Sequence, residues 1–445
     1  MTTLTALLVA ALGADLLGTA PGLELGYTGR LTPVAVSGPA AEKGFSIDWV
    51  VLEPRDTTPA ESLYLLTEDA AAQPWTSRFG FCTMDARENA PQIGYRFADR
   101  DHTLPLPGIV VPHVDRLLRD REAIDGPVRY DVVSEKQVAG RDCLMIETST
   151  NRGREATLAV EKSTGLIVTC RQSVVLGRGD RFLLSLDLAR ATPFDDSQAA
   201  RHRALADRFR RIASAVARVR DGEVAELAGE ELTTVANEIA PLTANAQGTV
   251  FESFAAVIAR NLNEQKTRTG SFAALEKKIV GSTAPPLELR DLDGKAIDAK
   301  LLDGRVVVLH FWDYDRDALE APYGQIGYLD FLQRRRAADG VVVIGVAVNR
   351  AFAKPESRHR AARSAKKLRE FMNIDYPLAG DDGTLIGGFG DPRPLGIRLP
   401  LWVVFDSNGI VRVFKSGLYD VEPNDGLKEL DSHLDRFLSP SDSAP

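Results

Sequence analysis

The first half of the chain alternates apolar and polar positions over short runs, from residue 23 to residue 193. The runs are rich in β-branched and aromatic residues and are separated by turn residues, which is the pattern of β-strands. Short turns join the last four runs, so they predict an antiparallel meander that forms a strongly curved sheet with one dry face. The predicted strands are 45–52, 62–66, 78–84, 93–97, 130–133, 141–148, 155–161, 166–176 and 180–188.

Between residues 195 and 280 the apolar spacing changes from two to three and four, which predicts amphipathic helices. Asp195 or Ser197 can cap the first helix. Its apolar face comprises Leu205, Phe209, Ile212, Val216 and Val219. Helices with one apolar face need a partner surface. We therefore expect 195–280 to be a helical spacer packed between two domains, with a dimerisation arm as the alternative.

Three further helices are expected in this region. The second follows the apolar positions up to Ile239 and ends near Pro241, because proline interrupts helical hydrogen bonding. The third begins at Thr249, where Thr249 and Glu252 have the spacing of a capping box. A short fourth helix is expected over 271–280.

The last third of the chain resembles a known family. The segment 284–295 and the strand Arg-Val-Val-Val-Leu-His-Phe-Trp at 305–312 resemble the TlpA-like branch of the thioredoxin and peroxiredoxin (AhpC/TSA) superfamily. The segment Ile-Arg-Leu-Pro-Leu-Trp-Val-Val-Phe-Asp at 397–406 is similar to the family's cis-proline loop and the central strand that follows it. The resemblance implies a thioredoxin-like α/β domain over 284–440. Its remaining elements are a helix near 319–336, a strand at 341–349, a basic helix near 359–372, a strand at 410–415 and a helix at 424–438.

The dithiol that follows the first strand in that family is missing. Aligning the loop from Phe311 and Trp312 puts Arg316 and Leu319 at the two cysteine positions, and aligning it from Glu320 puts Tyr314 and Asp317 there. Neither alignment supplies the thiolate that disulfide exchange or peroxide reduction requires. We therefore predict no catalytic residue and a vestigial active-site loop made of Trp312, Asp313, Tyr314, Asp315, Arg316, Asp317 and Leu319.

The three aspartates of this loop could hold a metal or a cationic ligand, but no histidine or second acidic pair accompanies them. A helix cap within a solvated loop explains them more simply, since a helix N-terminus favours negative charge. We expect no metal and no cofactor. His310 lies within the predicted strand, and we expect it to face the core.

In the first half, 138–147 and 158–167 resemble the second half of LolA-like lipoprotein-carrier domains. This resemblance implies a half-open β-barrel around a hydrophobic cavity for acyl chains, with Ala159 and Val174 facing inward. Cys143 and Cys170 are interpreted as buried small apolar residues. A whole strand of the meander would separate them, which is too far for a disulfide.

Composition narrows the picture further. A chain of 445 residues predicts two or three domains. Its net charge of −8, with arginines and acids interleaved, argues against nucleic acid as a partner. Three scattered cysteines, of which Cys82 is the first, are too few for a disulfide scaffold or a metal cluster.

The N-terminal residues 4–12 are apolar and are followed by small residues, so 1–20 is a candidate signal peptide. It would direct the protein to the periplasm or outside the cell. The alternative is a short N-terminal helix on a cytoplasmic protein. The apolar run is too short to cross a membrane, so we expect no transmembrane helix in the mature chain.

The sequence therefore predicts an α+β multidomain protein: a curved antiparallel half-barrel at 23–193, the helical spacer, and a thioredoxin-like domain. We expect a non-catalytic module that binds an extended peptide or an unidentified envelope protein in a groove at Leu399 and Pro400. Two alternatives stay open. One is a thiol–disulfide oxidoreductase that borrows a cysteine such as Cys82, and the other is a lipid or lipoprotein carrier that uses the N-terminal domain.

Overall fold

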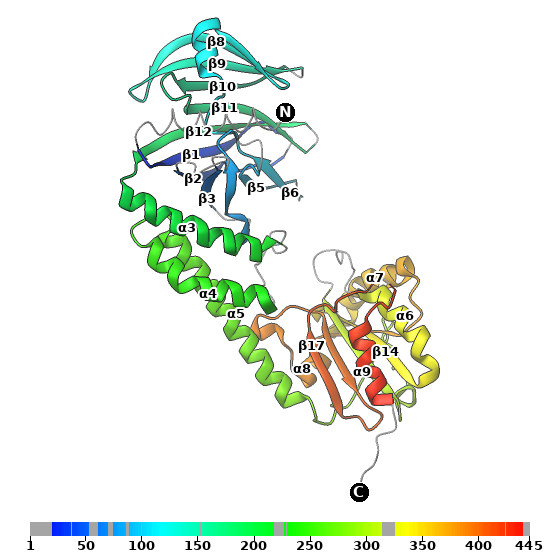
Figure 1. Ribbon diagram of the computed structural model, residues 1–445. Coiled ribbons are helices and arrows are strands. Elements are labelled where there is room, and N and C mark those ends of the chain that lie inside the picture. Colours follow the sequence, from blue (N-terminus) through cyan, green and yellow to red (C-terminus); the bar gives the residue numbers. More distant parts are fainter. Residues whose placement is uncertain are drawn as a thin grey trace. The chain divides into compact units, whose positions relative to one another are not determined.

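The computed structural model divides the chain into two compact units, residues 1–263 (unit 1) and 264–445 (unit 2) (Figure 1). The finer boundaries proposed from the sequence stay a prediction, and the candidate signal peptide lies almost entirely outside the described residues. The structure describes residues 20–36, 38–52, 61–69, 74–85, 89–98, 100–151, 153–177, 179–217, 227, 229–313, 325–422 and 424–438.

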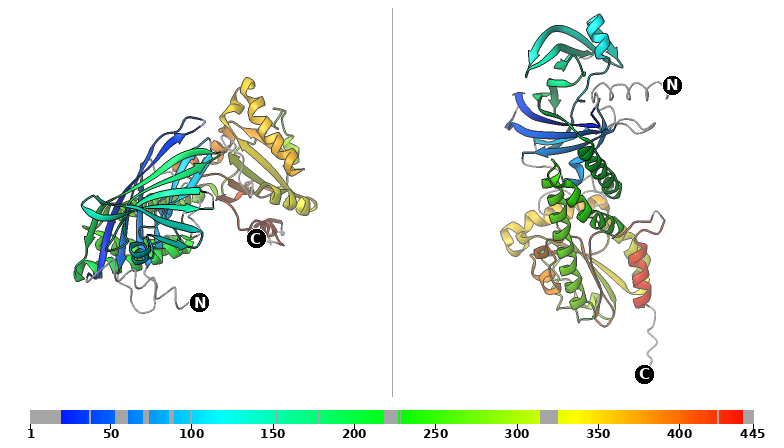
Figure 2. Two further views of the ribbon diagram at one scale, coloured as in Figure 1. Left: turned by 90° about the horizontal axis from the view of Figure 1, so that it is seen from above. Right: turned by 60° about the vertical axis from the view of Figure 1, so that its left-hand side comes forward.

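The main feature of unit 1 is a long, curved sheet (Figures 1 and 2). Within the described residues its strands are all antiparallel and follow the order β4-β3-β2-β1-β12-β11-β10-β9-β8-β7, so the sheet is open and ends at β4 and β7. The predicted meander and the open curved sheet are confirmed. The strands are β1 (Gly22–Ala35), β2 (Lys43–Leu52), β3 (Glu61–Glu68), β4 (Phe79–Thr83), β7 (Glu122–Asp125), β8 (Val128–Val138), β9 (Arg141–Thr150), β10 (Gly153–Glu161), β11 (Ile167–Leu176) and β12 (Asp180–Pro193).

One face of this sheet is covered by the chain's own hairpin of β5 (Gln92–Phe97) and β6 (Arg100–Pro105), and by the segment that leads into α2 (Val114–Asp120). Aromatic rings fill the interface: Tyr95 and Phe97 each meet Phe182 of β12 edge to face at 5.3 Å. The face that was expected to be dry is therefore closed by side chains of the same unit.

The opposite face of the sheet, over β2 to β4, is covered by helices α3 (Asp196–Ala215), α4 (Gly229–Ala246) and the first part of α5 (Glu252–Ile279). Phe79 of β4 packs against Phe209 of α3 at 5.0 Å and Phe254 of α5 at 5.8 Å. Asp195 caps α3 in a complete capping box with Gln198, as one of the two expected caps. The covered apolar faces explain why these helices are amphipathic.

Three details of the predicted helices are wrong. Pro241 lies inside α4, which continues because Leu242 and Ala246 are fully buried. The third and fourth helices are one helix, α5. The turn before α5 is not the expected capping box: the Glu252 carboxylate accepts from Gly248 N at 2.8 Å, and Thr249 Oγ1 accepts from Phe251 N at 3.2 Å.

Unit 2 is a five-stranded mixed sheet in the order β15-β14-β13-β16-β17, counted over the described residues. β14 is parallel to β13 and β15, while β16 is antiparallel to β13 and β17. Helices α6, α7 and α9 cover one face, and α8 with the end of α5 covers the other. The expected thioredoxin-like architecture is confirmed. Its elements are β13 (Val306–Asp313), α6 (Ile326–Arg336), β14 (Val341–Val348), α7 (Pro355–Met372), β15 (Leu378–Asp381), α8 (Thr384–Phe389), β16 (Leu401–Phe405), β17 (Val411–Ser416) and α9 (Lys428–Leu438).

A single segment, residues 281–297, contacts both outer strands of this sheet. Gly281 N donates to Val411 O at 2.8 Å, at the start of β17. Further along, Gly380 N of β15 donates to Arg290 O at 3.0 Å. Asp291 and Ala379 form an isolated antiparallel β-bridge. The segment then turns at Gly294, whose φ of +84° suits a residue without a Cβ.

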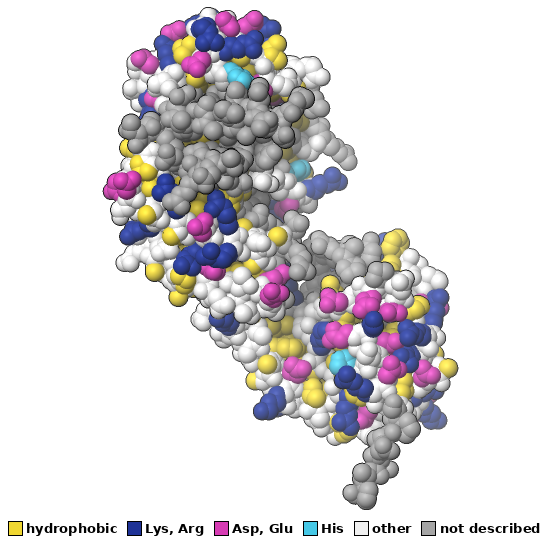
Figure 3. All heavy atoms as spheres, in the orientation of Figure 1, with side chains coloured by type: hydrophobic (Ala, Val, Ile, Leu, Met, Phe, Trp, Pro, Cys, Tyr) yellow, Lys and Arg dark blue, Asp and Glu magenta, His cyan; other side chains and the backbone are white. Residues whose placement is uncertain are grey.

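Charges on unit 2 are interleaved, as blue and magenta side chains show on the face drawn in Figure 3. The arginines at the end of α6 illustrate the pattern, with Arg334 2.9 Å from Asp330 and Arg336 2.6 Å from Asp431. Among the described residues, no helix is long and apolar enough to cross a membrane.

Candidate functional site

The loop before β16 has the expected cis peptide bond between Leu399 and Pro400. Pro400 is buried, and its carbonyl oxygen accepts a hydrogen bond from Gly417 N at 2.9 Å. The indole Nε1 of Trp402 donates to Gly417 O at 2.7 Å, and Ser416 Oγ donates to Arg398 O at 2.8 Å. These bonds fix the proline loop against the end of β17.

Leu399, which precedes Pro400, is half-buried. Within the described residues, its main-chain N–H and C=O make no hydrogen bond, in contrast to those of a residue inside a sheet. Leu418 follows Gly417, whose N–H donates to Pro400 O, and it exposes 47% of its surface. An extended main chain needs such unpaired groups to add to a protein as a strand.

Gln325, at the start of α6, links this helix to the loop after β17. Its Nε2 donates to Tyr419 O at 2.5 Å and its Oε1 accepts from Tyr419 N at 2.9 Å. The side chain is almost fully buried, so both bonds form away from water. Sequence reasoning missed this residue, because an isolated glutamine carries no pattern.

In the core of unit 2, His310 of β13 is fully buried in an aromatic stack. Its ring centroid lies 4.2 Å from that of Trp402 and 5.6 Å from that of Trp312, and Tyr419 meets Trp402 edge to face at 5.0 Å. Burial raises the pKa of Tyr419, so its hydroxyl stays protonated. The expectation that His310 faces the core is confirmed.

The vestigial loop is described only at its first residues. Trp312 is buried at the end of β13, and Asp313 closes that strand. Tyr314, Asp315, Arg316, Asp317 and Leu319 lie outside the described residues, so their role stays a prediction. Across the part of the chain that the structure describes, no group of three His, Cys, Asp or Glu side chains is arranged to hold a metal ion.

All three cysteines belong to unit 1, are buried there and form no disulfide. Burial raises the pKa of Cys143, and it raises the pKa of Cys170 to about 12. Such thiols stay protonated at neutral pH and are poor nucleophiles. Cys82 is 2% exposed, in the core under the β5–β6 hairpin.

Unit 1 also contains a cavity of about 160 Å³, between β8 to β11 and the segment 107–112. Pockets for drug-sized ligands have volumes of about 300–1,000 Å³, so this cavity is small. The expectation that Ala159 lines the interior is wrong. Leu158 and Val160 face the main core, and Ala159 packs with Cys143 on the opposite side, because side chains alternate along a strand.

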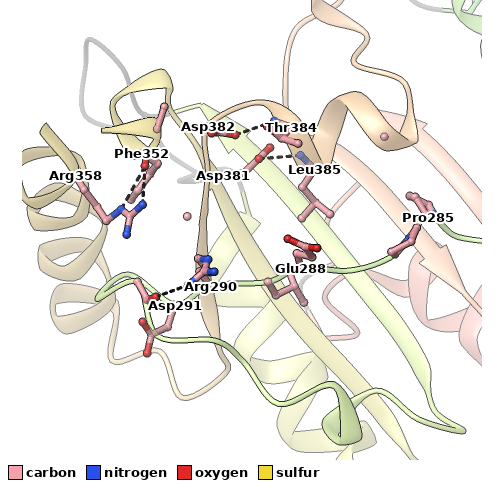
Figure 4. Close-up of a pocket in the computed structure, with 16 residues that line it drawn as sticks. Pro285, Glu288, Arg290, Asp291, Phe352, Arg358, Asp381, Asp382, Thr384 and Leu385 are labelled. Atoms are coloured by element: carbon pink, nitrogen blue, oxygen red, sulfur yellow. Dashed lines mark hydrogen bonds between the residues drawn. The ribbon is translucent and has the colours of Figure 1, made fainter. Parts of the chain in front are cut away.

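A larger pocket, of about 340 Å³, opens in unit 2 at the carboxyl ends of β14 and β15 (Figure 4). The segment 285–291 forms one wall, the first turn of α7 a second, and the β15–α8 turn a third. Ligands of open α/β sheets bind at this edge. The sequence did not predict this pocket, because its walls come from three distant segments.

Part of unit 2 is similar to a known family. Residues 280–414 match the AhpC/TSA family. The thiol-disulfide oxidoreductase ResA of Bacillus cereus is 28% identical over 142 residues, which are 32% of this chain and 72% of that protein. Chloroplastic peroxiredoxin Q of Oryza sativa subsp. japonica is 28% identical over 157 residues, 34% of this chain and 66% of that protein.

Similar solved structures carry related descriptions. A putative thiol:disulfide interchange protein DsbE of Chlorobium tepidum is 22% identical, with a TM-score of 0.27 over 36% of this chain and 97% of that chain. A secreted disulfide oxidoreductase of Mycobacterium tuberculosis is 16% identical, with a TM-score of 0.25 over 36% of this chain and 98% of that chain. The sequence matches and the mixed sheet with its cis-proline agree that the C-terminal unit of this chain is a thioredoxin-like domain of the AhpC/TSA family, similar to thiol-disulfide oxidoreductases.

Proposed function

We propose that this protein is a non-catalytic member of its family that binds an extended peptide at the proline loop of unit 2. The observation that carries the proposal is the unpaired main chain of Leu399 beside the cis Pro400, in a unit whose sequence contains no cysteine. A peptide strand can add to Leu399 through main-chain hydrogen bonds, and Leu418 offers an apolar contact to its side chains.

The missing thiol supports binding without chemistry. Reduction of a disulfide begins with attack by a thiolate, and no residue of unit 2 can form one. Gln325 and Trp402 hold the loop after β17 by hydrogen bonds that involve no cysteine, and Gly417 of that loop donates to Pro400 O. A groove can therefore keep its geometry after the reaction has been lost.

The alternative enzyme would have to borrow a thiol from unit 1. Cys82 is the candidate that the sequence suggested, but its side chain is packed in the core. Reaction with a protein disulfide would require that core to open, which favours the binding function.

A lipid carrier in unit 1 is the weaker alternative. The cavity of about 160 Å³ lies below the usual size for a ligand pocket, and aromatic side chains fill the rest of the curved face. We also propose that the protein is exported, because the apolar residues 4–12 and the small residues after them have the pattern of a signal peptide.

The binding proposal is tested with an extended peptide whose own thiols are blocked, the carboxymethylated B chain of insulin, by isothermal titration calorimetry. We expect saturable binding to the full-length protein, weakened at least tenfold by Leu418→Glu. The matched control is Val280→Glu, which changes another exposed aliphatic residue of unit 2, near the start of β17 rather than its end. Equal binding by both variants, or none by the wild type, would contradict the groove.

Redox inactivity is tested separately in an insulin-reduction assay with dithiothreitol. We expect no turnover above the blank. Turnover that disappears in Cys82→Ser would instead establish the borrowed-thiol enzyme.

A further inference from the structure

The pocket at the β15 edge contains two arginines that form no ion pair with any carboxylate among the described residues. Arg358, on the first turn of α7, donates from Nε and Nη2 to Phe352 O at 3.3 and 3.0 Å. Arg290 donates from Nη1 to Gly294 O at 3.2 Å. Figure 4 shows both guanidinium groups reaching the same space from two walls.

Backbone packing holds these two side chains in position. A Cβ on Gly294 would lie 2.6 Å from Arg358 Nη1, so the guanidinium of Arg358 packs directly against the turn whose carbonyl accepts from Arg290. A Cβ on Gly380 would likewise lie 2.5 Å from the Phe352 ring. Arg358, which two hydrogen bonds hold to Phe352 O, loses little side-chain entropy when it binds an anion, and the planar groups of both arginines suit a carboxylate.

Carboxylates form the other side of the pocket. Both oxygens of Asp381 accept hydrogen bonds from the main chain of α8, from Leu385 N at 2.9 Å and Ile386 N at 3.1 Å. Asp382 accepts from Thr384 N at 3.0 Å, and hydrogen bonds with Thr384 lower its pKa. Glu288 points into the same space in Figure 4. The lowered pKa keeps the Asp382 carboxylate ionised at neutral pH.

We infer that this pocket binds a small zwitterion of the amino-acid or dipeptide class. Its carboxylate lies between Arg290 and Arg358, and its ammonium group faces Glu288 and Asp382. The volume of about 340 Å³ is at the lower end of the range for ligand pockets, which suits a molecule of this size. A phosphate dianion has no positive end to meet the carboxylates, so the pocket disfavours it.

The inference is independent of the proline groove, because the pocket lies at β15 and the groove precedes β16, on the other side of β13 and β14. Experiments can therefore disprove peptide binding at the proline groove and zwitterion binding at this pocket independently of each other.

Calorimetric titration of the full-length protein with glycylglycine tests the pocket. We expect saturable binding, with acetate and methylammonium each binding at least tenfold more weakly and inorganic phosphate more weakly than glycylglycine. Phosphate binding that is tighter than glycylglycine binding would overturn the zwitterion in favour of a plain anion site. Absence of glycylglycine binding to the wild type would overturn the inference altogether.

Variants then assign the residues. Arg290→Gln should weaken glycylglycine at least tenfold, and Arg358→Lys, which keeps the charge but loses the planar fork, at least fivefold. Glu288→Gln should weaken glycylglycine and leave acetate unchanged. The control is Arg305→Gln, an exposed arginine immediately before β13, at the opposite end of the strands. Equal losses in Arg305→Gln and Arg290→Gln would mean that long-range charge, rather than this pocket, binds the ligand. Melting curves confirm that each variant is folded.

Discussion

The sheets of the two units bury their strands in different ways. In unit 2 all eight residues of β14 are buried, because β14 is parallel to both neighbours and helices cover both faces. In unit 1 the edge-proximal β8 is exposed or half-buried at every position, and its neighbour β9 alternates. Unit 2 therefore depends on continuous burial from both sides, whereas unit 1 depends on local covers over parts of a long sheet.

The largest effect should come from unit 2. Phe311→Ala removes a fully buried ring that meets Phe389 at 5.9 Å, and should lower the free energy of unfolding of this unit by about 4 kcal/mol. Denaturant unfolding followed by circular dichroism should show one shifted transition and one unchanged transition. Phe371→Ala, at a ring that is 73% exposed, serves as the control. A common shift of both transitions would mean that the units unfold together.

Unit 1 should be most sensitive to substitutions where the β5–β6 hairpin is attached to the long sheet. Lys43 Nζ lies 2.8 Å from Glu68 Oε1 in a buried ion pair, and the pair holds both main-chain groups of Gly94 in the β5–β6 hairpin. Lys43→Met should cost about 3 kcal/mol, because it leaves a carboxylate buried alone. The double variant with Glu68→Leu should recover part of the loss in the same unfolding experiment. A single variant as stable as wild type would contradict the attachment.

A smaller effect should depend on pH. Burial lowers the pKa of His202, on α3, from 6.5 to about 4, with the charge of Arg201 adding to the shift. From the sheet, Glu24 lies 4.0 Å from His202 Nε2 and pairs with Arg190, which also pairs with Asp48. A neutral His202 is favoured only in the folded state, so its contribution is complete above pH 6.5 and is lost as the pH falls toward 4.

We therefore expect unit 1 to lose about 1–2 kcal/mol from this group between pH 7 and pH 5. His202→Phe keeps the stacking on Phe194 but cannot titrate, so its stability should change less over that interval. The difference between the two proteins, measured by urea unfolding at each pH, isolates the histidine. Parallel pH profiles would contradict the assignment.

The smallest effect concerns the start of α3. Asp195→Ala removes the cap that accepts from Gln198 N at 2.8 Å and should destabilise unit 1 by about 1 kcal/mol. Asp196→Ala is the matched control, since it removes an acid from the first turn without removing the cap. Similar losses in both variants would assign the effect to charge at the helix end.

The sequence predicted those elements whose signal is local. The apolar runs of β13 and β14 and the proline loop each lie within a few residues. β1 was missed because its glycines break the pattern, and Gly29 is required where a Cβ would overlap the ring of Phe45. The length of α5 was missed because its residues 263–270 are mostly exposed, so the apolar spacing that reveals a helix pauses there.

The candidate sites were likewise predicted only where their sequence signal is local. The motif around Pro400 predicted the cis bond, but nothing local connects Gln325 to Tyr419 or Arg290 to Arg358. Gln325 and Tyr419 form their hydrogen bonds, and Arg290 and Arg358 line one pocket, only after the chain has folded. The prediction that Ala159 faces the interior was wrong by one residue, and a shift of one residue places a side chain on the opposite face of the sheet.

The segment 281–297 limits where the chain can be cut. Gly281 of this segment forms a hydrogen bond with the start of β17, and Arg290 and Asp291 pair with β15. A truncated fragment that begins at Pro285 would leave unpaired main-chain groups at β17, and one that begins after Asp291 would expose both outer strands. The unpaired main-chain groups of an exposed strand edge can pair with another copy of the chain, which leads to aggregation. A soluble fragment of the thioredoxin-like unit must therefore begin before Gly281, within α5.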